Sequence, residues 1–212
     1  GGNAVDAAIG MNAILCVAEP HMTGVGGDCF AMLSVDGSTN IKALNGSGKS
    51  SAKAKASALR RKNIMNITSE MPDAITIPGA VAAWSLLHKD HGHMPWKELF
   101  NPAINYAERG IIVHERVALD WKKNIKKLSY DADTSNLFLK NGSSFQFMDN
   151  FKNKNLSETF RTIADQGYNG FYRGWVANDM IKKLESIGGH HTLEDFGNAN
   201  AEWVKPISSN YR

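Results

Sequence analysis

The sequence has few cysteines and no long apolar run, and each absence excludes a class of protein. Cys16 and Cys29 are the only cysteines among 212 residues, which excludes a disulfide-stapled scaffold and a four-cysteine zinc site. The most apolar stretch, residues 4–18, is interrupted by Asp6 and Asn12, so no membrane-spanning helix is predicted. With 24 Lys and Arg against 21 Asp and Glu, the overall charge predicts no nucleic-acid partner.

Acidic residues are missing from one long segment of the chain. Between Asp36 and Glu70 there is no Asp or Glu, whereas the segment contains Lys42, Lys49, Lys53, Lys55, Arg60, Arg61 and Lys62. Several of these cations lie on a predicted helix of about ten residues that starts near Ala52. The basic stretch from Lys49 to Lys62 has two interpretations: a solvated helix face, or a surface that attracts anions.

The first fifty residues predict a helix followed by two strands. Asn3 is a good N-cap with Asp6 at position N3, and apolar side chains cover most of the helix that follows, so we expect it to be buried on nearly every side. After a glycine-rich loop, residues 29–35 and 41–44 read as antiparallel strands joined at Asp36-Gly37.

The rest of the chain predicts mainly helices, at about 80–91, 115–128, 157–166 and 174–187, with an extended segment from Trp203 to Tyr211. The predicted class is therefore α+β within one domain. Residues 1–50 supply a helix and strands of the core, and residues 51–212 supply a mostly helical body. Because a lone hairpin leaves open edges, we expect that the chain can form a homo-oligomer through exposed sheet edges.

Several short motifs fail on their context. The glycine loop at residues 24–27 follows a helix and precedes a strand, the reverse of a dinucleotide fingerprint, and Gly48-Lys49-Ser50 lacks the first glycine of a P-loop. His88 and His91 have the spacing of helical ligands, but Gly92 breaks the helix before His93 and no further strong ligand is nearby, so no metal site is predicted, and no cofactor is expected. No serine lies in a nucleophile elbow and no cysteine lies in a protease pattern, so no catalytic residue is assigned within this chain.

Several strings, taken together and in order, carry a resemblance that spans nearly the whole chain. They are Gly1-Gly2-Asn3-Ala4-Val5-Asp6-Ala7-Ala8, Glu19-Pro20-His21-Met22-Thr23-Gly24-Val25-Gly26-Gly27, Pro78-Gly79 before an Ala-rich helix, Pro95-Trp96, Phe171-Tyr172-Arg173-Gly174 and Thr192-Leu193-Glu194-Asp195. In this order they resemble the N-terminal half of the γ-glutamyltranspeptidase family.

The resemblance implies a fold and a chemistry. The family has the αββα fold of the N-terminal nucleophile hydrolases, and its precursor cleaves itself into a large and a small subunit. The Thr exposed by cleavage is the nucleophile, with its own amine as base, and attacks a γ-glutamyl amide such as that of glutathione; water or an amine then takes the acyl group. By this resemblance the chain is part of a large subunit whose partner, the small subunit, carries the nucleophile. The chain alone is therefore expected to be inactive.

The resemblance also suggests where a substrate is bound. Family members have an Arg after the second strand that pairs with the substrate α-carboxylate, and the match of residues 43–47 places Ser47 there. Lys49 is a candidate for the missing charge, so the candidate substrate-binding residues are Asn45, Ser47 and Lys49. The departure favours a first alternative, an acylase similar to the cephalosporin acylases. A second alternative is a non-catalytic scaffold that binds anions on the stretch from Lys49 to Lys62.

Overall fold

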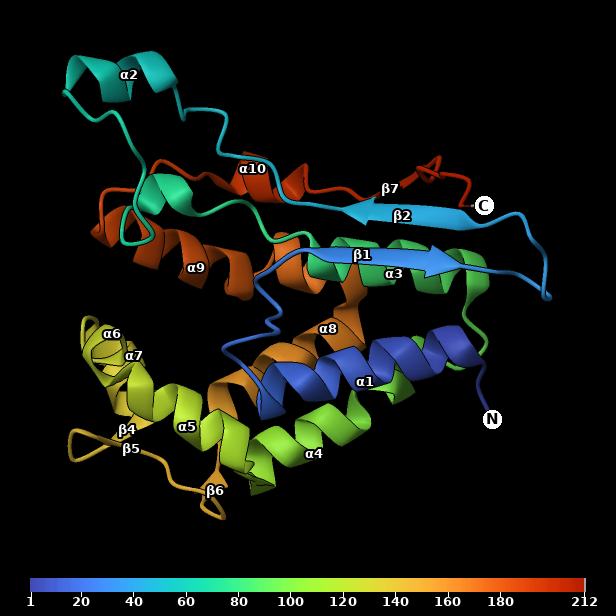
Figure 1. Ribbon diagram of the computed structural model, residues 1–212, viewed down its shortest axis with the longest axis horizontal. Coiled ribbons are helices and arrows are strands. Elements are labelled where there is room, and N and C mark those ends of the chain that lie inside the picture. Colours follow the sequence, from blue (N-terminus) through green and yellow to red (C-terminus); the bar gives the residue numbers. More distant parts are fainter. Residues whose placement is uncertain (212) are drawn as a thin grey trace.

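A small antiparallel sheet is formed by three strands from the two ends of the chain. The computed structural model describes residues 1–211, and in it β1 (Cys29–Leu33), β2 (Lys42–Gly46) and β7 (Glu202–Val204) are ordered β1-β2-β7 (Figure 1). Asp36 and Gly37 both have positive φ, as the predicted hairpin between β1 and β2 requires. The third strand was predicted only as an extended segment, and it completes the sheet from the far end of the sequence.

The strand register divides the sheet into two unlike faces. Cys29, Ala31 and Leu44 belong to the face that packs on the helical core. The opposite face, called here the outer sheet face, consists of Phe30, Met32, Ala43, Asn45, Glu202 and Val204. Phe30 and Met32 expose 68% and 71% of their surface. Within residues 1–211, β1 and β7 each have one strand neighbour, so both sheet edges are open.

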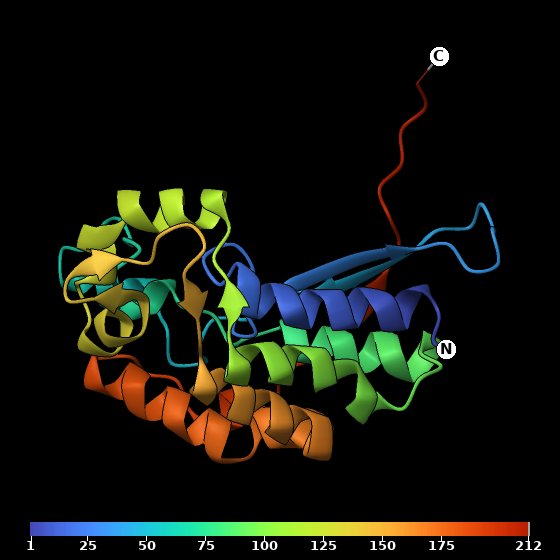
Figure 2. The same ribbon diagram turned by 90° about the horizontal axis from the view of Figure 1, so that it is seen from below.

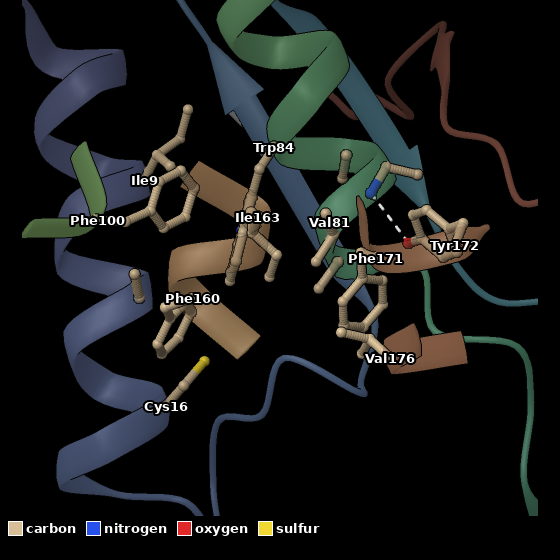
Figure 3. Close-up of a cluster of buried hydrophobic side chains, with 14 of the residues drawn as sticks. Ile9, Cys16, Val81, Trp84, Phe100, Phe160, Ile163, Phe171, Tyr172 and Val176 are labelled. Carbon is tan, nitrogen blue, oxygen red and sulfur yellow. Dashed lines mark hydrogen bonds between the residues drawn. The ribbon is translucent and has the colours of Figure 1, made fainter. Parts of the chain in front are cut away.

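The main core lies between the sheet and a set of helices on one side of it (Figure 2). These helices are α1 (Ala4–Ala18), α3 (Ala80–His91), the 3-10 helix η2 (Trp96–Phe100), α4 (Asn101–Arg109), α8 (Lys154–Tyr172) and α9 (Trp175–Ser186). Figure 3 shows how Ile9 and Cys16 of α1 lie near aromatic residues of η2 and α8, while Trp84 lies between α1 and the sheet. The predicted α+β class is confirmed.

Helix α1 begins with the predicted capping box but is not buried on nearly every side. The Asn3 side chain accepts hydrogen bonds from the N–H groups of the first turn, and the Asp6 carboxylate accepts one from the Asn3 N–H. Only one stripe, from Val5 through Ile9 to Cys16, faces the core. Met11 is 60% exposed, because α1 lies at the outside of the helical layer with neighbours on one side only. That expectation was therefore wrong.

The basic segment forms a shorter helix than the predicted ten residues. Helix α2 spans Ala56–Arg61, and a turn closed by the Ala54 N–H and the Ser51 carbonyl replaces its first part. Lys55, the N-cap residue, makes no side-chain capping hydrogen bond, so the start of this short helix is not stabilised by a cap. A 3-10 turn, η1 (Pro72–Ala74), returns the chain to the core before α3.

Residues 111–151 form a lobe with its own small core. Its elements are β3 (Ile111–Ile112), α5 (Glu115–Lys123), α6 (Ile125–Leu128), α7 (Ala132–Phe138), β4 (Leu139–Lys140), β5 (Ser143–Ser144) and β6 (Asn150–Phe151). Trp121 is the centre of this core and contacts Phe145 and Phe151. The predicted single helix over 115–128 is interrupted at Asn124, whose side chain bonds the carbonyl of Asp120 and whose backbone leaves the helical region.

Helix α9 matches its predicted range of 174–187 closely, whereas α8 extends beyond the predicted 157–166 at both ends. The predicted helix stop at Gly167 is confirmed, because this residue, with φ of 59°, leaves the helical region; α8 is a helix on either side of this kink, and its second part reaches Tyr172. Helix α10 (Leu193–Gly197) starts with a capping box between Thr192 and Asp195. Within residues 1–211, no helix combines the length and apolar character needed to cross a membrane.

Candidate active-site cleft

A cleft of about 560 Å³ opens beside the end of β2. Its walls come from three parts of the chain: the turn after β2, the segment that leads into α3, and the segment around α10. The lining residues are Ser47, Gly48, Lys49, Ser50, Ala52, Ile77, Pro78, Gly79, Asp195, Asn198, Ala199 and Asn200. Half of the lining residues have polar side chains, and these place an ammonium group, a carboxylate, hydroxyl groups and amide groups around the cleft, while backbone and apolar side chains supply the rest of its surface.

Hydrogen bonds fix the turn that forms the first wall. The Asn45 side-chain oxygen accepts the Ser47 N–H at 3.0 Å, an Asx-type turn. The Asp28 carboxylate accepts the Gly48 N–H at 2.8 Å, and the Ile77 N–H donates to the Lys49 carbonyl at 2.8 Å. The turn is therefore attached both to the start of β1 and to the segment before α3.

Two glycines allow these backbones to cross in contact. A Cβ atom on Gly48 would lie 1.9 Å from the Ile77 carbonyl oxygen, and one on Gly79 would lie 2.0 Å from the Gly46 carbonyl oxygen. Both distances are far below any contact that a carbon atom tolerates. Glycine is therefore required at positions 48 and 79 because the two backbones touch there, and not only because the chain turns.

The Asp195 carboxylate joins the cleft walls across 143 residues of sequence. One oxygen accepts the Ala52 N–H at 2.9 Å, and the other accepts the Thr192 N–H and hydroxyl, both at 2.9 Å. The buried Ser51 hydroxyl lies 3.2 Å from the same carboxylate. Partial burial opposes ionisation, but these hydrogen bonds together hold the pKa of Asp195 below its ordinary value.

The structure places the three predicted site residues in two different roles. Ser47 and Lys49 are exposed and line the cleft. Asn45 is half-buried, lies on the outer sheet face and shapes the turn through its bond to Ser47. That these residues bind substrate remains a prediction.

Sequence reasoning did not find the wall near α10. Asp195, Asn198 and Asn200 reach the cleft from more than 140 residues away. Thr192 and Asp195 form a local capping box, a pattern that gives no sign that the same carboxylate also accepts the Ala52 N–H.

The cleft lining contains one cation and two hydroxyl groups that could contact a ligand. Lys49 provides a positive charge, and Ser47 and Ser50 provide hydroxyl groups. None of the lining residues is His or Cys, so neither cleft serine has an imidazole base among the described walls. The histidines considered above for a metal lie elsewhere: His88 bonds the Met94 carbonyl and His91 packs on Trp203. Among residues 1–211 no group of three potential ligands is placed to hold a metal ion.

Solved structures with the same arrangement define the class of protein. The chain matches gamma-glutamyltranspeptidase from Helicobacter pylori with a TM-score of 0.92 and 30% identity, over all of this chain and 62% of that one. It matches a cephalosporin acylase from Bacillus halodurans with a TM-score of 0.91 and 32% identity, over all of this chain and 40% of that one. The fold is that of the γ-glutamyltranspeptidases among the N-terminal nucleophile hydrolases.

Sequence comparison assigns the family. The gamma-glutamyltranspeptidase family model matches residues 1–212, and the chain belongs to this family. A curated relative, the glutathione hydrolase-like YwrD proenzyme of Bacillus subtilis, is 33% identical over 212 residues, covering all of this chain and 40% of that protein. The chain thus spans well under half the length of this relative, and the resemblance noted in the sequence is confirmed.

Proposed function

We propose that the chain is the large-subunit part of a γ-glutamyl hydrolase or transferase and that its cleft binds the carboxylate end of the substrate. The observation that carries this proposal is the position of Lys49 in the cleft immediately after β2. An ammonium group forms charge-assisted hydrogen bonds with a carboxylate, which is the group that a γ-glutamyl donor presents beside its amide. Ser47 and Ser50 add hydroxyl groups that can orient the same end.

The nucleophile in this proposal comes from the small subunit. The family resemblance assigns it to a Thr freed by self-cleavage. The Thr hydroxyl attacks the amide carbonyl, the Thr amine takes up the proton, and the amine product leaves with a proton returned to it. Water or an acceptor amine then resolves the ester. The residues of this chain bind and orient the donor, and the absence of His and Cys from the cleft walls agrees with that division of work.

The outer sheet face is the proposed docking surface for the small subunit. An αββα fold needs a second sheet against the first, and Phe30 and Met32 would lose their exposure on such packing. The open edges of β1 and β7 could add strands from the same partner. When the partner is missing, these edges would pair two copies of the chain, and light scattering across concentrations tests this: a strictly monomeric chain contradicts it.

The first test is the intact mass of the protein expressed from its complete reading frame, before and after incubation. Conversion into two chains, the smaller beginning with Thr, supports the proposal. In the mature protein, Lys49→Ala should raise KM for glutathione at least about tenfold with little change in kcat, because an ion pair to the donor is lost. Lys152→Ala, an exposed lysine outside the cleft, is the control. An unchanged KM for Lys49→Ala would remove Lys49 from the site.

A second candidate activity is the hydrolysis of other dicarboxylic side-chain amides. Ser47 stands where the family resemblance expects a guanidinium, so the bidentate clamp on an α-amino acid is missing. The cephalosporin acylase of Bacillus halodurans matches this chain as closely as the transpeptidases do. Turnover of glutathione and of a glutaryl amide by the same preparation separates the two candidates.

A further inference from the structure

The segment of residues 52–69, called here the basic arm, carries charge of one sign only. Its cations are Lys53, Lys55, Arg60, Arg61 and Lys62, and it contains no Asp or Glu. Helix α2 in its middle has no buried residue and projects away from the rest of the fold in Figure 1. The arm is therefore a surface feature, and burying apolar area cannot be its main purpose.

The cations of the arm lie close together in the sequence and have no carboxylate partner in the part of the chain that the structure describes. All five are exposed, and among the described residues no carboxylate lies within 4.0 Å of any of them. Elsewhere, by contrast, Lys97 pairs with Asp165 and Lys183 pairs with Asp131. Like charges held together without a counter-charge repel one another, and binding an anion relieves that repulsion.

The arm starts at the wall of the candidate cleft. Ala52 and Lys49 both line the cleft, and Lys53 follows directly. The Ala52 N–H is held by the Asp195 carboxylate, so the foot of the arm is fixed to the body. Anionic groups gathered on the arm would therefore stay close to the cleft mouth.

The composition of the arm distinguishes between kinds of anionic partner. No Phe, Tyr or Trp occurs between Phe30 and Trp84, so the arm has no ring on which a nucleic-acid base could stack. Leu59 is the one large apolar residue of α2, and it is half-buried, so this helix has no apolar face for a lipid surface. Met65 and Ile67 are 77% and 51% exposed, and each could contact one apolar side chain of a partner.

From these observations we propose that the basic arm binds an acidic polypeptide segment. Its carboxylates would pair with the guanidinium and ammonium groups of α2 and the residues before it, and its apolar side chains would contact Met65 and Ile67. The proposal concerns a binding surface and needs no catalytic turnover, so it can be tested independently of the proposed enzyme activity.

The test measures binding by the protein expressed from its complete reading frame. The probe is a fluorescein-labelled peptide of alternating Glu and Leu, followed by fluorescence anisotropy at about 20 mM and about 300 mM salt. We expect saturable binding at low salt that weakens strongly at high salt. The triple variant Arg60→Glu, Arg61→Glu, Lys62→Glu should weaken binding at least tenfold, a conservative order-of-magnitude expectation for reversing three contacts.

A matched variant separates the arm from overall charge. Lys122→Glu, Lys123→Glu, Lys126→Glu changes net charge by the same amount on an exposed basic part of α5 and α6 and should leave affinity within about twofold. A milder double variant, Lys53→Gln, Lys55→Gln, guards against loss of folding and should still weaken binding. Equal losses in the arm and control variants overturn the proposal, as does absence of binding at low salt. Tighter arm-dependent binding of single-stranded DNA, or of vesicles rich in anionic lipid, would assign the arm to that partner instead.

Discussion

The hydroxyl group of Tyr172 donates a hydrogen bond to the Pro78 carbonyl at 2.7 Å and accepts one from the Ala82 N–H at 3.0 Å. The second of these bonds is the dashed line in Figure 3. Gly79, the N-cap residue of α3, has no side chain to cap the helix, so a residue of α8 does so. Burial raises the pKa of Tyr172, so its hydroxyl keeps the proton that it donates. One buried oxygen thus fixes the start of α3, which forms a wall of the cleft.

Removing this hydroxyl should destabilise the protein. Tyr172→Phe leaves a buried N–H and a carbonyl without their partner, which costs about 1–3 kcal/mol, and each kcal/mol lowers the melting temperature of a protein of this size by about 2–4 °C. Thermal unfolding measures the effect. Tyr130→Phe, at a residue that is 79% exposed, should change nothing measurable and is the control. Equal melting temperatures for the two variants would show that Tyr172 does not cap α3.

The Asp195 carboxylate should contribute stability that depends on pH. Its pKa is lower in the folded protein, so its contribution is fully present above the unfolded value of about 3.9 and is lost as pH falls through the folded value. Asp195→Asn should therefore be less stable than the natural protein at pH 7, and the gap should close below about pH 4. Denaturant unfolding at several pH values measures this.

A control for Asp195 is available on α9. Asp179→Asn changes an exposed carboxylate that forms no ion pair among the described residues, and it should be neutral across the same pH range. A gap between Asp195→Asn and the natural protein that does not change with pH would mean that the lost contact is steric rather than ionic.

Gly48 should tolerate no side chain. Gly48→Ala forces the turn after β2 away from the Ile77 carbonyl, and we expect a loss of about 3 kcal/mol or more because backbone, not a flexible side chain, is in the way. Gly26→Ala has open space around it and should be tolerated. The yield of folded protein and its unfolding midpoint compare the two, and a stable Gly48→Ala protein would contradict the close crossing.

The outer sheet face should be needed only when the partner is present. Phe30→Asp places a charge where the proposed small subunit packs, so the complete protein should lose assembly and maturation. The chain alone should keep its helical content and melting temperature. Met65→Asp, at an exposed apolar residue on the arm, should leave maturation unaffected. Size-exclusion chromatography and intact mass report both properties, and normal maturation of Phe30→Asp would rule out this docking surface.

Much of the fold could be predicted because its signals are local. The capping pair of Asn3 and Asp6, the hairpin at Asp36-Gly37 and the start of α3 after Pro78-Gly79 each depend on a few adjacent residues. The errors have another origin. Apolar residues such as Met11 are open because no described element covers that side of α1, and no local pattern reports where a neighbouring layer is missing.

The site was predictable only on one wall. Ser47 and Lys49 stand in a glycine-flanked turn after a strand, a context visible in the sequence. Asp195 was visible in the sequence only as part of a string that carries the family resemblance. Its bond to Ala52 depends on how α10 packs, which is a tertiary relationship without a sequence signature.

The chain enters and leaves the lobe of residues 111–151 at one narrow neck. Strands β3 and β6 pair there, with Ile111 opposite Phe151, and the Val113 N–H donates to the Asp149 carbonyl at 2.8 Å. A segment whose two ends already touch can change in length or sequence with little strain on the scaffold, provided that its contacts with His21 and Lys183 of the body are kept. The length and sequence of the lobe can therefore differ among members of one family while β2, α3 and the cleft beside them keep their arrangement.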